Sequence, residues 1–71
     1  MTEFEDYIID AKKQLNCNAS EHYKKNYITY GYTNQEIDAN LDYFERCMKF
    51  GLSAYKALLF FYDYLNGGYD I

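Results

Sequence analysis

The sequence predicts an all-α fold, a small bundle of three to four short helices in a single domain. Apolar residues recur at the spacing of a helical face in several segments. Residues that cap helices stand at the borders of these segments. The chain has no proline, which suits short helices joined by short turns. Because a chain of 71 residues buries only about 60–65% of its unfolded surface, we expect one small core.

The first helix is expected over residues 3–15. Thr2 and Glu5 have the spacing of a capping box, in which the hydroxyl accepts from a helix amide and the carboxylate reaches back to the cap. Ile9 lies about 100° from the apolar face, which leaves it available to solvent. That face consists of Phe4, Ile8, Ala11 and Leu15.

Two further helices are expected over residues 19–30 and 34–50. The face of the first carries tyrosines, and its end, YITYGY, has an irregular or extended segment as the alternative. The second begins at a capping box of Thr33 and Glu36 and ends before Gly51. Its apolar face is formed by Ile37, Leu41, Phe44 and Met48. Spacing also allows ion pairs of Asp42 with Arg46 and of Glu45 with Lys49.

The fourth helix, residues 54–65, is the most apolar segment. Only Lys56 and Asp63 are charged in it, so it needs cover on more than one side, from the rest of the chain or from a second copy. Ser53 is expected to cap its start and Gly67 with Gly68 to end it, and residues 66–71 are expected to form a loose tail. Its apolar face is Ala54, Leu58, Phe61 and Leu65.

Composition restricts the classes of partner. Eleven carboxylates against seven basic residues give a net charge of −4, which opposes direct binding to nucleic acid. The longest apolar block is far shorter than a membrane span. The two cysteines do not form the dense framework of a secreted scaffold, so we expect reduced thiols and a cytoplasmic protein.

Catalysis and metal binding are not expected. The nearest approach to a nucleophile and base is Cys17 with His22, and a thiol enzyme using this pair is kept as an alternative. Close pairs of metal ligands are absent, so neither metal nor cofactor is predicted. The stretch from Tyr30 through the later GLSAYKALLFF resembles a helix-turn-helix in outline. We reject DNA reading because the period continues unbroken from residue 42 to 50, and because residues 54–65 hold only one lysine.

Two features indicate a protein-binding surface. Carboxylates recur on two predicted helices, and packing these side by side would give an acidic face suited to a basic partner. Aromatic residues make up 21% of the chain, with ten tyrosines, more than so small a core can cover. The partner-binding candidates are Glu36, Asp38, Asp42, Glu45, Tyr55, Phe60, Tyr62 and Tyr64.

The sequence therefore favours a small acidic, non-enzymatic protein-binding module. Its composition resembles that of short proteins encoded by AT-rich phages and mobile elements. The most specific form of the binding-module hypothesis is an inhibitor of a host nucleic-acid enzyme, such as a nuclease or CRISPR effector, acting by occlusion through its carboxylates and tyrosines. The structural alternative is a homodimeric accessory protein that associates through the aromatic helix 54–65.

Overall fold

The computed structural model describes residues 2–17 and 30–68, which form four helices and, within these two ranges, no strand. The helices are α1 (Glu3–Cys17), α3 (Asn34–Asp38), α4 (Leu41–Lys49) and α5 (Ala54–Leu65). The predicted all-α class is confirmed. The helix expected over 19–30 lies outside the described residues except for Tyr30, which belongs to an irregular connection leading to α3.

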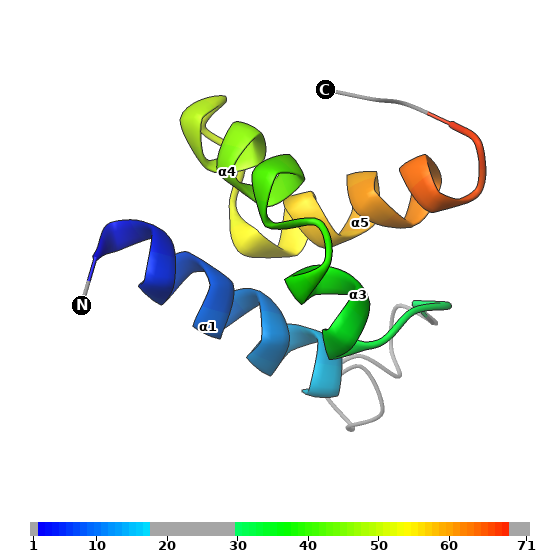
Figure 1. Ribbon diagram of the computed structural model, residues 1–71, viewed down its shortest axis with the longest axis horizontal. Coiled ribbons are helices and arrows are strands. Elements are labelled where there is room, and N and C mark those ends of the chain that lie inside the picture. Colours follow the sequence, from blue (N-terminus) through cyan, green and yellow to red (C-terminus); the bar gives the residue numbers. More distant parts are fainter. Residues whose placement is uncertain (1, 18–29, 69–71) are drawn as a thin grey trace.

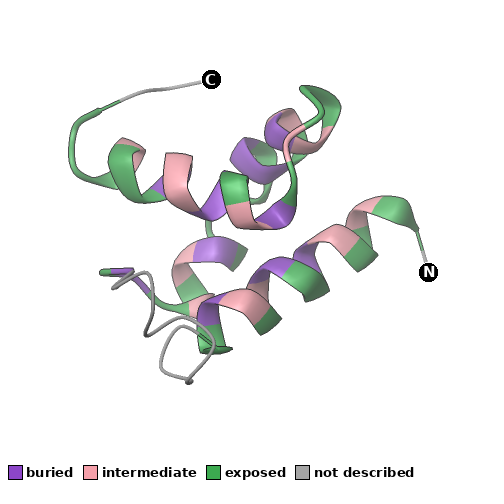
Figure 2. Cartoon of the chain, turned by 180° about the vertical axis from the view of Figure 1, so that it is seen from behind, coloured by how far each residue is buried: buried purple, intermediate pink, exposed green. Residues whose placement is uncertain are grey.

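The helices pack around α1 and α5 (Figure 1). α1 contacts α3, α4 and α5, while α5 is also covered by α4. Segments from both ends of the chain thus share one core, with the purple buried residues of each helix facing inward in Figure 2. The chain itself covers the face of α5 that carries Ala57, Leu58 and Phe61, while Tyr62 and Leu65 of the same helix are exposed.

The helix borders follow the predicted caps. The Glu5 N–H donates to Thr2 Oγ1 at 3.0 Å, and the Lys56 N–H donates to Ser53 Oγ at 3.2 Å. Gly51 has φ +90°, a conformation in which a side chain is strained. Its N–H and that of the next residue donate to two carbonyls of the last turn of α4 at 3.0 Å each, which is the Schellman arrangement.

Gly67 and Gly68 end α5, as predicted, but residues 66–68 are not part of a loose tail. Gly67 has φ +83°, and the Gly68 N–H donates to the Asp63 carbonyl at 2.7 Å. A Cβ atom at residue 68 would stand 2.7 Å from the same carbonyl oxygen, so the position requires glycine. Residues 66–68 therefore form a hydrogen-bonded helix cap, and only 69–71 of the expected tail lie outside the described residues.

The single helix predicted over 34–50 is wrong, because the chain breaks between α3 and α4. The side-chain amide of Asn40 donates to the Glu36 carbonyl at 2.8 Å, the acceptor that its own backbone N–H would use in a continuous helix. That N–H turns instead to the Ile37 carbonyl at 3.0 Å. The break rotates the buried face of α4. Tyr43 and Cys47 are buried with Phe44, whereas the expected Leu41 is 39% exposed.

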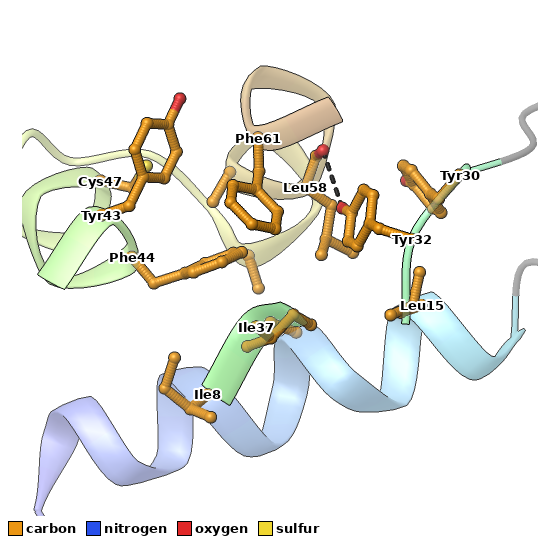
Figure 3. Packing of buried hydrophobic residues seen from close by; sticks show 13 residues of the cluster. Ile8, Leu15, Tyr30, Tyr32, Ile37, Tyr43, Phe44, Cys47, Leu58 and Phe61 are labelled. Carbon is orange, nitrogen blue, oxygen red and sulfur yellow. Dashed lines mark hydrogen bonds between the residues drawn. The ribbon is translucent and has the colours of Figure 1, made fainter. Parts of the chain in front are cut away.

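Five aromatic rings, which we call the ring cluster, form the centre of the core: Tyr32, Tyr43, Phe44, Phe61 and Tyr64. Phe61 is fully buried and meets the rings of Tyr32 and Phe44 edge-on at 4.9 Å between centroids (Figure 3). Tyr43 stacks on Tyr64 at 4.7 Å. Such pairs stabilise the fold beyond the area they bury. α1 closes the core from the other side with Ile8, Ala11 and Leu15, as predicted.

Two tyrosine hydroxyls join segments that are distant in the sequence. Tyr7 of α1 donates to the Leu52 carbonyl at 2.8 Å, in the turn before α5. Tyr32 donates to the Leu58 carbonyl at 2.9 Å inside the core. Burial raises the pKa of Tyr7 to about 12, and raises that of Tyr32 further. Both hydroxyls therefore remain protonated donors at neutral pH.

Candidate functional site

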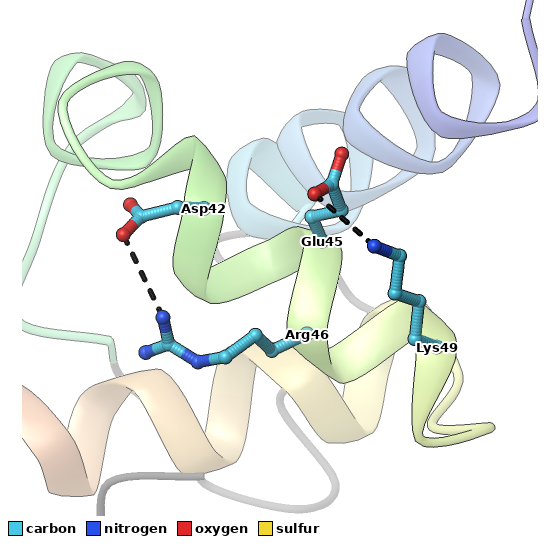
Figure 4. A network of polar contacts seen from close by, with 4 residues as sticks. All are labelled: Asp42, Glu45, Arg46 and Lys49. Atoms are coloured by element: carbon cyan, nitrogen blue, oxygen red, sulfur yellow. Dashed lines mark hydrogen bonds and ion pairs between the residues drawn. The ribbon is translucent and has the colours of Figure 1, made fainter.

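The four predicted carboxylates are all engaged within the chain. Asp38 pairs with Lys12 of α1 at 2.7 Å, and Glu36 Oε1 accepts from the backbone N–H of Thr33 at 3.2 Å. The other two pairs are those expected from the spacing, Asp42 with Arg46 at 3.6 Å and Glu45 with Lys49 at 3.5 Å (Figure 4). α1 does contact α3 and α4, as the acidic-face hypothesis required. However, much of the negative charge on α3 and α4 is compensated by neighbouring cations.

The four predicted aromatic residues do not form one patch. Tyr64 belongs to the ring cluster, and Tyr62 is 38% exposed beside Gly31. Tyr55 and Phe60 are half-buried, and lie on different sides of α5 by helical spacing. The most exposed large apolar residue in the described part of the chain is instead Phe50, at 76%, beside the glycine turn that follows α4. Self-association through α5 remains a prediction, and the exposed large apolar residues of α5 are Tyr62 at 38% and Leu65 at 39%.

An open apolar groove lies where α1 meets the junction of α3 and α4. We call it the α1 groove; its lining residues are Phe4, Glu5, Ile8, Ile9, Asp38 and Leu41. Two of them, Ile9 at 50% and Leu41 at 39%, are among the exposed large apolar residues. Its volume of about 260 Å³ is below the roughly 300–1,000 Å³ of pockets that enclose small molecules. The size and openness suit apolar side chains of another protein.

The rim of the α1 groove is acidic. Glu5 and Asp38 are its only charged lining residues. Glu3 and Asp6 stand with Glu5 in the first turn of α1. No cation of residues 2–17 or 30–68 lies within ion-pair distance of the three α1 carboxylates, those of Glu3, Glu5 and Asp6. Within the described residues, the negative charge at the groove that no cation compensates therefore belongs to α1, one of the two helices whose carboxylates were expected to form the acidic face.

Sequence reasoning did not assemble this groove, although one of its signals was visible. Ile9 stood out as an apolar residue off the core face of its helix, and it is exposed as that position implied. Leu41 was assigned to the core, because the break at Asn40 was not foreseen. No pattern in the sequence places these two side chains next to each other, since that depends on how α1 packs against α4.

The thiols differ in exposure. Cys47 is fully buried, and burial raises the pKa of its thiol to about 11, so it is not a thiolate nucleophile at neutral pH. Cys17 is exposed at the end of α1, whereas its proposed partner His22 lies outside the described residues. Among the residues that the structure places, no three histidine, cysteine, aspartate or glutamate side chains gather as a metal site would require.

The break at Asn40 leaves one of the two grounds on which DNA reading was rejected in place, because α4 runs without interruption from Leu41 to Lys49. The other also remains, because α5 carries a single basic residue, Lys56, and turns its most apolar face into the core. Of the helices in the described ranges, none has the length and apolar character needed to cross a bilayer. Comparison with known proteins finds no matching family model, curated protein or solved structure.

Proposed function

We propose that this chain is a non-enzymatic protein-binding module whose α1 groove receives a basic amphipathic helix of a partner. The observation that carries the proposal is the position of exposed Ile9 and Leu41 beside the first-turn carboxylates of α1, which have no cation at ion-pair distance among the described residues. Apolar side chains on one face of the partner helix fill the groove, and its lysines or arginines meet the α1 acids.

The proposed partner class is a protein that itself binds nucleic acid. Such proteins carry basic segments that contact phosphates. An acidic module bound to such a segment prevents nucleic acid from binding, because it pairs with the same basic side chains. The net charge of −4 supports this form of the proposal. Inhibition of a nuclease or a similar enzyme by occlusion is its most specific version.

Binding to a defined peptide tests the proposal. The probe is a short fluorescein-labelled helix with leucines on one face and arginines beside them, titrated with the full chain by fluorescence anisotropy. We expect saturable binding that weakens as salt rises, because screening reduces attraction between exposed charges. An uncharged peptide with the same leucine face should bind more weakly. Equal binding of both peptides would contradict the acidic rim.

Two matched substitutions locate the site. Leu41→Arg introduces a cation into the groove, whereas Leu65→Arg makes the same change at a residue of equal exposure, 39%, outside the groove lining. We expect the first variant to lose at least tenfold in affinity and the second less than twofold. Circular dichroism of both variants checks the fold. Equal losses would refute the groove, and light scattering of the free protein would then test self-association through α5.

A displacement experiment tests the nucleic-acid form of the proposal. The full chain, immobilised, captures proteins from a cell lysate, and short duplex DNA is then added in excess. Partners held through a phosphate-binding segment should be released by the DNA and should not be captured by Leu41→Arg. Partners that resist DNA would point to a protein with a different kind of basic segment.

A further inference from the structure

The two charged positions of the α1 groove differ in what already neutralises them. At one, Lys12 Nζ lies 2.7 Å from Asp38 Oδ1, and the lysine side chain is only 32% exposed. At the other, Glu5 is exposed and has no cation at ion-pair distance within the described ranges. Asp38 is therefore already paired with a cation, whereas Glu5 has no ion-pair partner among the described residues and is available to a cation of a bound segment.

We infer that Glu5 is the residue that recognises the cation of a bound segment, and that Lys12 repels a cation placed at the Asp38 end. This inference rests on the proposed function of the α1 groove. A cation arriving at Asp38 must displace Lys12 or sit within a few ångströms of it, where like charges repel. A cation at Glu5 meets no such competitor among residues 2–17 and 30–68. Specificity then comes from an attractive group at one end and a repulsive group at the other.

This arrangement fixes the direction in which a partner helix lies. The apolar lining residues of the groove, Phe4, Ile8, Ile9 and Leu41, accept a helix in either direction. Only one direction brings a given arginine to Glu5. A segment with a single arginine at one end therefore binds in one orientation, and a segment with its cation at the wrong end loses the ion pair.

Substitutions in the full chain test the inference with the same arginine-containing peptide. Glu5→Gln removes the charge and keeps a residue type compatible with the capping box at Thr2. We expect a three- to tenfold loss of affinity and a shallower dependence on salt. Asp63→Asn is the control, because it removes an equal charge from an exposed residue of α5 outside the groove lining, and it should change affinity less than twofold.

Removal of the internal ion pair completes the test. Lys12→Met alone should tighten binding severalfold, whereas the double variant Lys12→Met with Asp38→Asn should stay within twofold of the unaltered chain. If Glu5→Gln has no effect, or if the double variant loses as much as Glu5→Gln, the inference is overturned while the groove stands. If the unaltered chain does not bind the peptide at all, the proposed function itself has failed.

Discussion

Replacement of Phe61 by alanine should remove a large part of the stability of this protein. The ring is fully buried, and four other rings surround it at centroid distances of 4.9 to 6.2 Å. Phenylalanine-to-alanine changes in cores destabilise by about 3–5 kcal/mol, through lost transfer free energy and the cavity that remains. A 71-residue domain has a total stability of about 4–11 kcal/mol. The variant should therefore be close to the limit of folding.

Urea unfolding followed by circular dichroism measures this loss. Phe60→Ala is the matched control, because it removes the same ring from the adjacent position of α5, where the side chain is half-buried and outside the ring cluster. We expect the control to lose about 1 kcal/mol or less. With a urea dependence near 1 kcal/mol per molar, the Phe61→Ala midpoint should fall by about 3 M. A difference below 1 kcal/mol between the two variants would refute the central role of Phe61.

Three further predictions concern single groups. Tyr32→Phe should destabilise by about 1 kcal/mol in the same assay, because it removes the buried hydrogen bond to the α5 backbone, and Tyr62→Phe should be neutral. A thiol reagent at pH 8 should label one cysteine per native chain and two per unfolded chain. The reason is that Cys47 is buried and has a pKa of about 11, so only about one thiol in a thousand is ionised at this pH. Fast labelling of both thiols in the native chain would contradict this. Gly51→Ala should lower the free energy of unfolding by about 1 kcal/mol, because its φ of +90° is strained for a residue with a side chain. In the comparison variant Gly31→Ala, the new Cβ makes only an ordinary contact, 3.5 Å from the Tyr62 ring. Equal shifts of the melting temperature in the two variants would argue against backbone strain at Gly51.

Local chemistry explains which parts of the fold the sequence could predict. Thr2, Ser53 and Gly51 act through hydrogen bonds or backbone conformations within a few residues, so their roles follow from spacing alone. The break at Asn40 was missed because the apolar period of residues 37–48 continues across it. The signal was the asparagine itself, whose side-chain amide can compete with the backbone for a helix carbonyl.

The candidate site was harder to predict, because it depends on contacts between distant segments. The spacing correctly predicted the ion pairs of Asp42 with Arg46 and of Glu45 with Lys49. These pairs compensate two of the negative charges on which the acidic-face hypothesis depends. The pair of Lys12 with Asp38 crosses from α1 to α3 and has no local signature. Tyr64 was expected at a surface, but its stacking on Tyr43 depends on the rotated face of α4.

Ile9 and Leu41 stand outside the set of side chains that holds the helices together. Exposed positions of this kind accept most substitutions with changes of about 0.5 kcal/mol or less. The residues at these two positions can therefore be substituted, by natural drift or in a randomised library, without destabilising the helical core. So small a chain is consequently a practical starting point for selecting new binders.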